Sequence, residues 1–162
     1  GNDTYIVDNA KDKVIEGSRK GTDLVKSSDS YWIKDKDVEN LTLTGRRNIN
    51  GTGNKSDNTL LGNSSNNKLY GGRGSDTLMG GIGVDNLYGE GGSDIFQLTE
   101  GSGYDKIRDF TKGEDLIYIN NFDNVGIVKD GNHSNIYKGD DLLAIVFDET
   151  DISQYGNLGI FA

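Results

Sequence analysis

Short alternations of apolar and polar residues recur along the whole chain, separated by stretches rich in Gly, Asp and Asn. In residues 4–7, Tyr5 and Val7 alternate with their neighbours, which is the two-residue period of a β-strand. The same pattern predicts strands at residues 13–16, 23–26, 30–33 and 38–45. In the last of these, Leu41 and Leu43 share a face. The pattern predicts an all-β fold.

From residue 71 to residue 97 the alternation acquires a strict nine-residue phase. The sequence is GGRGSDTLM, GGIGVDNLY, GEGGSDIFQ, with Asp at position six and an apolar residue at position eight. The alternative is a flexible Gly–Asp linker, but a linker does not hold Leu78, Leu87 and Phe96 in phase. Because Gly permits tight loops and the last three residues can extend, each unit is predicted to be a loop followed by a short strand.

Two such units make one coil of eighteen residues, so loops eighteen residues apart stack on one edge. We therefore expect Asp76 over Asp94, with Asp85 on the opposite edge. Stacked carboxylates repel each other unless a cation lies between them. Carboxylate and carbonyl oxygens suit Ca²⁺, whereas Zn²⁺ would require the His or Cys ligands that this stretch lacks.

Two weaker nonapeptides, GNKSDNTLL and GNSSNNKLY, precede the strong ones in the same frame and have Asn58 and Asn67 at position six. We expect Asn58 below Asp76 and Asn67 below Asp85. An amide brings no charge, so these loops are expected either to bind Ca²⁺ weakly or to close through Asn hydrogen bonds.

The consecutive units resemble the GGxGxDxUx repeat of RTX (repeats-in-toxin, haemolysin-type) proteins. The resemblance implies a parallel β-roll with several Ca²⁺ ions between its turns, bound by loop carbonyls and the sixth-position Asp. Glu90 departs from the pattern, and there only the backbone carbonyl would serve. The implied metal-binding positions are Gly71, Gly72, Arg73, Gly74, Asp76, Gly80, Gly81, Gly83, Asp85, Gly89, Gly91, Gly92 and Asp94, with Asn58 and Asn67 as weaker members.

Further acidic positions extend this set on both sides. Asp3 and Asp23 lie twenty residues apart, and either hold another Ca²⁺ or form a solvated acidic face; the further ligands for such an ion would be Asp8, Asp12 or Glu16. Asp105 lies twenty residues beyond Asp85, in a segment that resembles the closing part of RTX rolls, and is predicted to complete the last site on that edge. Asp109 is either a metal ligand or a turn cap.

The C-terminal part predicts an antiparallel cap on the parallel roll. Residues 125–148 alternate as hairpins, with turns at residues 130–132 and 138–141, and the apolar run 142–147 is the expected buried strand. A stack needs such a cap because its end would otherwise expose apolar core and free strand edges. The tail, residues 151–162, is either part of a secretion signal or a terminal strand. We divide the chain into degenerate coils (1–52), repeats (53–97) and cap (98–162).

Composition narrows the functional classes. The chain has 162 residues, 24 Gly, no Pro, no Cys and a formal net charge of −9. Its acidity argues against a nucleic-acid partner, the absence of Cys excludes a disulfide framework, and no apolar run is long enough for a transmembrane helix. Residues 1–3 match the end of a loop whose first half is missing, so we expect a fragment of a longer protein.

No catalytic centre is recognisable, because His133 is the only histidine, lies in a predicted turn and belongs to no HExxH motif. The resemblance implies a secreted bacterial module that stays loose in low cytosolic calcium, leaves through type I secretion and folds on calcium outside the cell. A second interpretation is a carbohydrate-binding module similar to the R-modules of mannuronan epimerases, and a third is the C-terminal part of a serralysin-like metalloprotease. The candidates for a sugar-stacking surface, which would otherwise cover the flank of a coil, are Tyr31, Trp32, Tyr70, Tyr88 and Tyr118.

Overall fold

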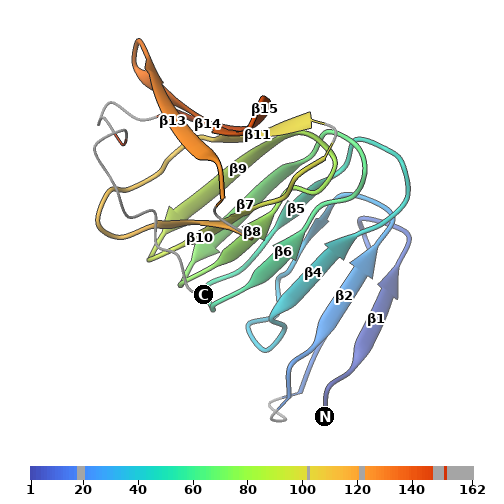
Figure 1. Ribbon diagram of the computed structural model, residues 1–162. Coiled ribbons are helices and arrows are strands. Elements are labelled where there is room, and N and C mark those ends of the chain that lie inside the picture. Colours follow the sequence, from blue (N-terminus) through green and yellow to red (C-terminus); the bar gives the residue numbers. More distant parts are fainter. Residues whose placement is uncertain (18–20, 102, 121–122, 148–151, 153–162) are drawn as a thin grey trace.

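The chain winds into a solenoid of about six turns whose two walls are parallel β-sheets (Figure 1). The computed structural model describes residues 1–17, 21–101, 103–120, 123–147 and 152. Within these ranges there is no helix, and so none with the length and apolar character needed to cross a membrane. The predicted all-β parallel roll with an antiparallel C-terminal part is confirmed.

After the first turn, which gives only β1 to sheet A, the chain alternates between the two walls from β2 to β12. In spatial order, sheet A contains β1 (Thr4–Val7), β2 (Leu24–Ser27), β4 (Asn40–Leu43), β6 (Thr59–Leu61), β8 (Thr77–Met79), β10 (Ile95–Leu98) and β12 (Leu116–Ile119). The parallel strands of sheet B are β3 (Tyr31–Trp32), β5 (Asn50–Thr52), β7 (Lys68–Arg73), β9 (Gly83–Gly91) and β11 (Gly103–Ile107).

The eighth residue of each nonapeptide forms the core between the two sheets. Leu78 is aligned with Leu60 on one side and Phe96 on the other in sheet A, and Leu69 is aligned with Leu87 in sheet B. All five side chains are fully buried. At about 1.5 to 3 kcal/mol for each buried side chain, this ladder of apolar residues is what fixes the nine-residue phase.

One predicted strand is wrong. Residues 13–16 form no strand, because side chains take the place of a neighbouring strand as hydrogen-bond partners. The backbone N–H of Val14 donates to the Tyr31 hydroxyl (3.3 Å), and that of Glu16 donates to Asp35 Oδ2 (2.9 Å). The segment therefore runs along the edge of the first coils as an irregular loop.

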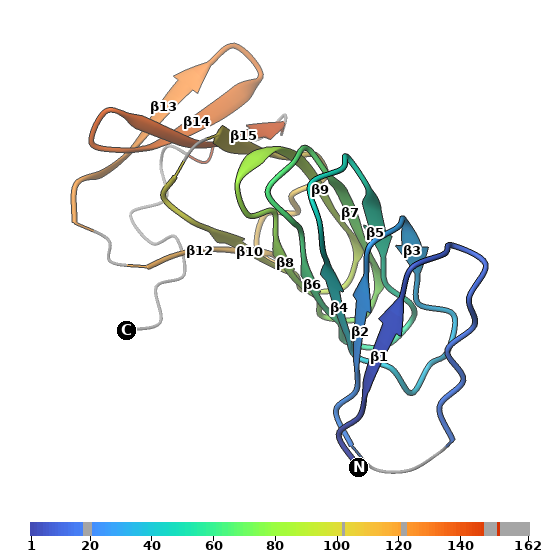
Figure 2. The same ribbon diagram turned by 90° about the vertical axis from the view of Figure 1, so that its right-hand side faces the viewer.

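The cap continues sheet B instead of forming a separate layer. Beside β11 lies β15 (Asp141–Phe147), which is parallel to it, followed by the antiparallel strands β14 (His133–Lys138) and β13 (Val125–Asp130), all at the end opposite β1 (Figure 2). The apolar run of β15 is buried as predicted, through Leu143, Ala144 and Val146. His133 begins β14 and so lies outside the predicted turn. The tail at residues 151–162 lies outside the described residues except for Ile152, which is buried.

Candidate metal centres

A column of carboxylate and carboxamide side chains runs along one edge of sheet A. Each of the seven strands is immediately preceded by one such residue. In spatial order, the residues of this sheet A column are Asp3, Asp23, Glu39, Asn58, Asp76, Asp94 and Asp115.

Hydrogen bonds join neighbouring members of the sheet A column in one direction. The backbone N–H of Asn58 donates to Asp76 Oδ1 (2.7 Å), and that of Asp76 donates to Asp94 Oδ1 (2.8 Å). The N–H of Asp94 in turn donates to Asp115 Oδ1 (2.9 Å). The predicted stacking of Asn58, Asp76 and Asp94 is therefore present, and each bond uses only one oxygen of the acceptor.

The opposite edge carries a second, shorter column formed by Asn67, Asp85 and Asp105. The backbone N–H of Asn67 donates to Asp85 Oδ1 (2.7 Å), and Asp85 is paired in register with Asp105. The structure thus places Asn67 below Asp85 and Asp105 beyond it, as expected. The next residue in register is Ala144 of β15, so this sheet B column ends where the cap begins.

Several carboxylate oxygens of the columns are buried without a partner. Asp76 Oδ2, Asp85 Oδ2 and Asp105 Oδ1 are inaccessible and accept no hydrogen bond. Leaving a buried ionised carboxylate oxygen unpaired is costly, so each site requires either a proton or a cation.

In the nonapeptides that have Asp at position six, the first glycine faces these oxygens. A Cβ added at Gly71 would touch Asp76 Oδ2 and lie 2.7 Å from the carbonyl oxygen of Gly89 in the next coil. A Cβ at Gly80 would touch Asp105 Oδ1 and lie 2.6 Å from Asp85 Oδ2. Carboxylate and carbonyl oxygens therefore line the same space, which is the donor set that Ca²⁺ takes in flexible geometry. The residues present fit calcium.

The loop backbone has the conformation that lets successive carbonyls stack. Gly72 and Gly74 have φ of 111° and 106°, in the left-handed region where a side chain is disfavoured. Glu90, the residue that departs from the repeat pattern, also has a positive φ of 68°. Its backbone N–H donates to Asp109 Oδ2 (2.9 Å), and that of Gly89 donates to Asp109 Oδ1 (3.0 Å). Both oxygens of Asp109 thus accept backbone N–H groups, which is the bonding expected of a turn cap, whereas its role as a metal ligand stays a prediction.

The two Asn loops satisfy the same positions within the protein. Asn58 Oδ1 accepts the N–H of Asn54 (2.7 Å), and its Nδ2 donates to the carbonyls of Val38 (3.3 Å) and Glu39 (3.2 Å). Asn67 Oδ1 likewise accepts the N–H of a loop residue, and its Nδ2 donates to the Ile49 carbonyl (2.7 Å). The amide NH₂ binds carbonyls that a cation would otherwise draw together, so these loops close through the predicted hydrogen bonds.

Burial sets the protonation of the carboxylates in the absence of metal. Desolvation raises the pKa of Asp76 to about 7, of Asp94 to about 6 and of Asp105 to about 8. For Asp105, the adjacent negative charge of Asp85 adds to this rise. Burial also raises the pKa of Asp85, so this pair holds a proton near neutral pH when no cation is bound.

Sequence inspection did not place two members of the sheet A column, Glu39 and Asp115. Glu39 and Asp115 lie nineteen residues before Asn58 and twenty-one residues after Asp94, so they are out of the eighteen-residue phase. On the other edge, Gly101 and Gly103 have positive φ (153° and 116°) shortly before Asp105, and a two-residue insertion hides their correspondence with the repeat. The detectable signal was an acidic or amide residue directly before every apolar alternation.

Comparison with known proteins agrees with this geometry. The family model of the RTX calcium-binding nonapeptide repeat (4 copies) matches residues 52–87 and 72–107. The matched region covers both the Asn loops and the Asp loops, and it includes the loop that ends at Asp105. Repeats of this family bind calcium. No curated protein matches the chain.

The substitution Asp76→Asn separates metal binding from the metal-free fold. It replaces an unpartnered buried carboxylate with the amide that already closes the Asn58 loop. We expect calcium affinity to fall by about tenfold or more. At pH 8 we expect the metal-free form to gain about 1 to 3 kcal/mol of stability, the scale of one unsatisfied buried polar group. Calorimetric calcium titration and thermal unfolding in chelator measure the two effects.

The matched control is Asp57→Asn. Asp57 is exposed, and its Oδ1 accepts the Ser75 N–H (2.7 Å), which an Asn oxygen also does. This variant loses the same charge one residue from the column, so we expect both quantities to stay near wild type. Equal effects of the two substitutions would show that net charge, and not the buried oxygen, controls the site.

The pH dependence should change sign with calcium. The folded-state pKa values of Asp76, Asp94 and Asp105 lie above the ordinary Asp value of about 3.9. In the metal-free protein their stabilising contribution is therefore complete below pH about 4 and is lost as pH rises through about 6 to 8. In saturating calcium, stability should instead rise over this range, because protons compete with the metal. Thermal unfolding at pH 5.5 and 8.5 in metal-stripped and calcium buffers tests this, and greater metal-free stability at pH 8.5 would contradict it.

Proposed function

We propose that this chain, an RTX calcium-binding β-roll module, is a calcium-dependent folding and stabilising element of a secreted bacterial protein. The observation that carries the proposal is the set of buried carboxylate oxygens without partners in both columns, at Asp76, Asp85 and Asp105. A roll with these oxygens ionised and unpaired is penalised, whereas the same roll with a cation between its loops is stabilised.

The magnitude of metal binding is sufficient for a switch. An ion present at a hundred times its Kd stabilises the folded state by about 2.7 kcal/mol, provided that the unfolded chain does not bind it. Three such ions add roughly 8 kcal/mol, which is comparable to the whole stability of an ordinary domain, about 5 to 15 kcal/mol. Calcium then decides whether the roll is folded.

The two sides of a bacterial membrane supply the two states of this switch. In the low calcium of the cytosol, a chain of net charge −9 repels itself and stays loose, which suits passage through the type I secretion machinery. In extracellular calcium the loops bind metal, and the roll folds and stabilises the protein to which it is attached. The role is structural and non-catalytic: the module acts as a spacer and folding element.

Far-UV circular dichroism of the chelator-treated protein during calcium titration tests this function. We expect a β signal that appears cooperatively at about 10⁻⁴ to 10⁻³ M calcium, the range of extracellular calcium modules. Magnesium at the same concentrations serves as the control and should leave the spectrum of the metal-free chain unchanged. A metal-free protein that is already fully folded, with a melting temperature indifferent to calcium, would refute the switch.

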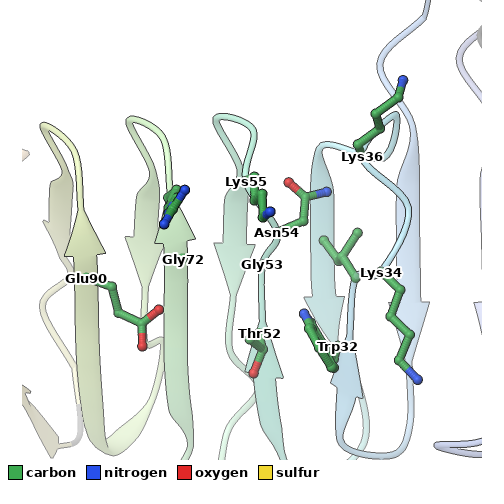
Figure 3. A pocket seen from close by; sticks show the side chains of 11 residues that line it. Trp32, Lys34, Lys36, Thr52, Gly53, Asn54, Lys55, Gly72 and Glu90 are labelled. Carbon is green, nitrogen blue, oxygen red and sulfur yellow. The ribbon is translucent and has the colours of Figure 1, made fainter.

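A second candidate function, binding of an acidic polysaccharide, is favoured by one groove of about 800 Å³ (Figure 3). The groove runs across the C-terminal ends of β3, β5, β7 and β9, along the edge that carries the sheet A column. Trp32 lies on its wall with 57% of its surface exposed, and Lys34 Nζ lies 5.6 Å from the Trp32 ring centre.

The charge of this groove is opposite to that of the molecule. Its lining includes four cationic side chains and one carboxylate, Glu90, in a chain of net charge −9. The cationic residues are Lys34, Lys36, Lys55 and Arg73. Lys36 also pairs with Asp37 (2.6 Å), which offsets its charge. An exposed indole beside cations suits a sugar ring that carries a carboxylate, because the ring stacks on the indole while the carboxylate pairs with Lys or Arg.

Oligouronate binding at fixed free calcium tests this second function. Trp32→Ala should abolish measurable binding in calorimetry, and Lys34→Gln should weaken it by about tenfold, the effect of a lost charge-assisted contact worth about 1.4 kcal/mol. Lys26→Gln, a matched charge change at an exposed position of β2 on the other sheet, should have no effect. Equal binding by all four proteins, or equal affinity for a neutral glucan, would exclude the groove as an acidic-glycan site.

A further inference from the structure

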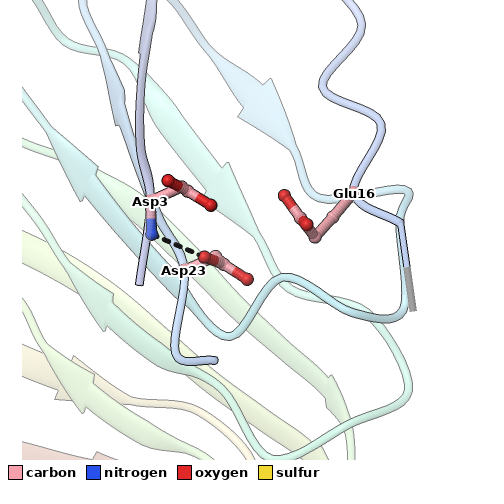
Figure 4. Close-up of side chains that lie close together, drawn as sticks. All are labelled: Asp3, Glu16 and Asp23. Atoms are coloured by element: carbon pink, nitrogen blue, oxygen red, sulfur yellow. Dashed lines mark hydrogen bonds between the residues drawn. The ribbon is translucent and has the colours of Figure 1, made fainter. Parts of the chain in front are cut away.

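Three carboxylates gather outside the matched repeats, beside the first two strands of sheet A. Oxygen atoms of Asp3, Glu16 and Asp23 all lie within 4.8 Å of one another. Figure 4 shows the three carboxylates facing the same space, Asp3 and Asp23 from adjacent strands and Glu16 from the loop that precedes β2. Neither of the other candidate ligands considered for this region, Asp8 and Asp12, belongs to the cluster among the described residues.

A second observation, independent of the clustering, indicates that an ion binds beside Asp23. Its side chain is fully buried, and its Oδ1 accepts the backbone N–H of Asp3 (2.7 Å). Its Oδ2 is also buried and has no hydrogen-bond partner. A buried carboxylate oxygen without a partner, in a space shared with two further carboxylates, requires a positive charge.

The backbone around Asp3 and Asp23 repeats the second half of a metal-type loop. The bond from the Asp3 N–H to Asp23 Oδ1 matches the bond from Asp76 to Asp94. One residue earlier, the N–H of Thr22 donates to Asn2 Oδ1 (3.0 Å), as that of Ser75 donates to Asp57 Oδ1.

The glycine of each half-loop completes the correspondence. A Cβ at Gly21 would collide with the carbonyl oxygen of Gly1, just as a Cβ at Gly92 would collide with that of Gly74. Residues 1–3 and 21–23 are therefore stacked half-loops of the metal-binding kind.

The first half of these loops is replaced by a carboxylate from elsewhere in the chain. Glu16 is half-buried, its backbone N–H is held by Asp35 Oδ2 (2.9 Å), and its Oε2 accepts the hydroxyl hydrogen bond of Tyr5. These contacts aim the Glu16 side chain at Asp3 and Asp23. We propose that Asp3, Glu16 and Asp23 form a calcium site of their own, in which Glu16 substitutes for the carbonyl oxygens of the missing half-loop.

The size of the cluster agrees with calcium. Oxygens on opposite sides of a Ca²⁺ ion lie about 4.6 to 5.2 Å apart, and those across Mg²⁺ about 4.0 to 4.2 Å. The three ligand oxygens, all within 4.8 Å of one another, are close enough together to contact a single Ca²⁺ ion. Among the described residues, one ion pair involves these carboxylates, between the Gly1 amine and Asp3 Oδ2 at 4.0 Å. Three negative charges therefore exceed the local positive charge and favour a divalent ion.

Occupation of this site would fasten the loop of residues 8–17 to β1 and β2. The site goes beyond the proposed function, since the repeats can bind calcium and fold whether or not it exists. It adds one ion to those held by the repeats and confines its effect to the first coil.

The test counts calcium ions in the full 162-residue chain by equilibrium dialysis, using calcium itself as the probe. Glu16→Gln should lower the stoichiometry by one ion. In hydrogen exchange, it should remove the calcium-dependent protection of the Asp3 and Leu24 amides, which bond to Asp23 and Asp3. The matched control is Asp8→Asn, an exposed carboxylate of the same loop, which should change neither quantity.

A second variant protects the test against misfolding. Asp3→Asn alters a side chain that is 57% exposed, so it should fold normally and also lose one ion. Unchanged stoichiometry in both cluster variants, or an equal loss in Asp8→Asn, would overturn the proposal. If Asp76→Asn lowers the calcium stoichiometry while both cluster variants keep the wild-type value, the repeats bind calcium and the Asp3–Glu16–Asp23 cluster does not.

Discussion

The structure depends on how pairs of buried carboxylate oxygens are neutralised between adjacent coils. Stacking eighteen-residue coils buries an apolar ladder efficiently, but it also places Asp over Asp at both edges. At Asp76 and Asp85, one carboxylate oxygen is paired with the backbone of the neighbouring coil, whereas the second has no partner. The packing of the core and the charge of the edges therefore oppose each other until a cation or a proton is present.

The chain contains two solutions to this conflict on the same scaffold. At Asn58 and Asn67 a neutral amide donates to the carbonyls of the preceding coil, so the loop closes without metal. At Asp76 and Asp85 a bare oxygen faces carbonyls and carboxylates, so closure requires an added charge. The first solution gives stability that is always present. The second makes stability depend on the environment, which is the property that a conditional folding element needs.

The sequence predicted the fold and the stacking because both follow from period. The nine-residue phase placed Asn58, Asp76 and Asp94 on one edge, and the structure agrees. Prediction failed where side chains replaced backbone pairing or where insertions broke the phase. Residues 13–16 lost their predicted strand to bonds with Tyr31 and Asp35, and Glu39 was overlooked because its coil has nineteen residues. Which acid would join Asp3 and Asp23 depended on the path of an irregular loop, which no periodicity describes. The division of the chain at residues 52 and 97 stays a prediction.

The one-way hydrogen bonding of the sheet A column gives the solenoid a chemical polarity like that of a growing polymer. At the cap end, the N–H of Asp115, which would have to donate to a following coil, instead donates to the carbonyl oxygen of Thr111 (2.9 Å), so the series of bonds ends there. At the other end, the Asp3 carboxylate is 57% exposed and has the orientation of an acceptor for the N–H of one more coil. One more coil on the β1 side would therefore continue the same bonding pattern. The length of this roll is therefore set from the β1 side, independently of the bonds that end the column at Asp115.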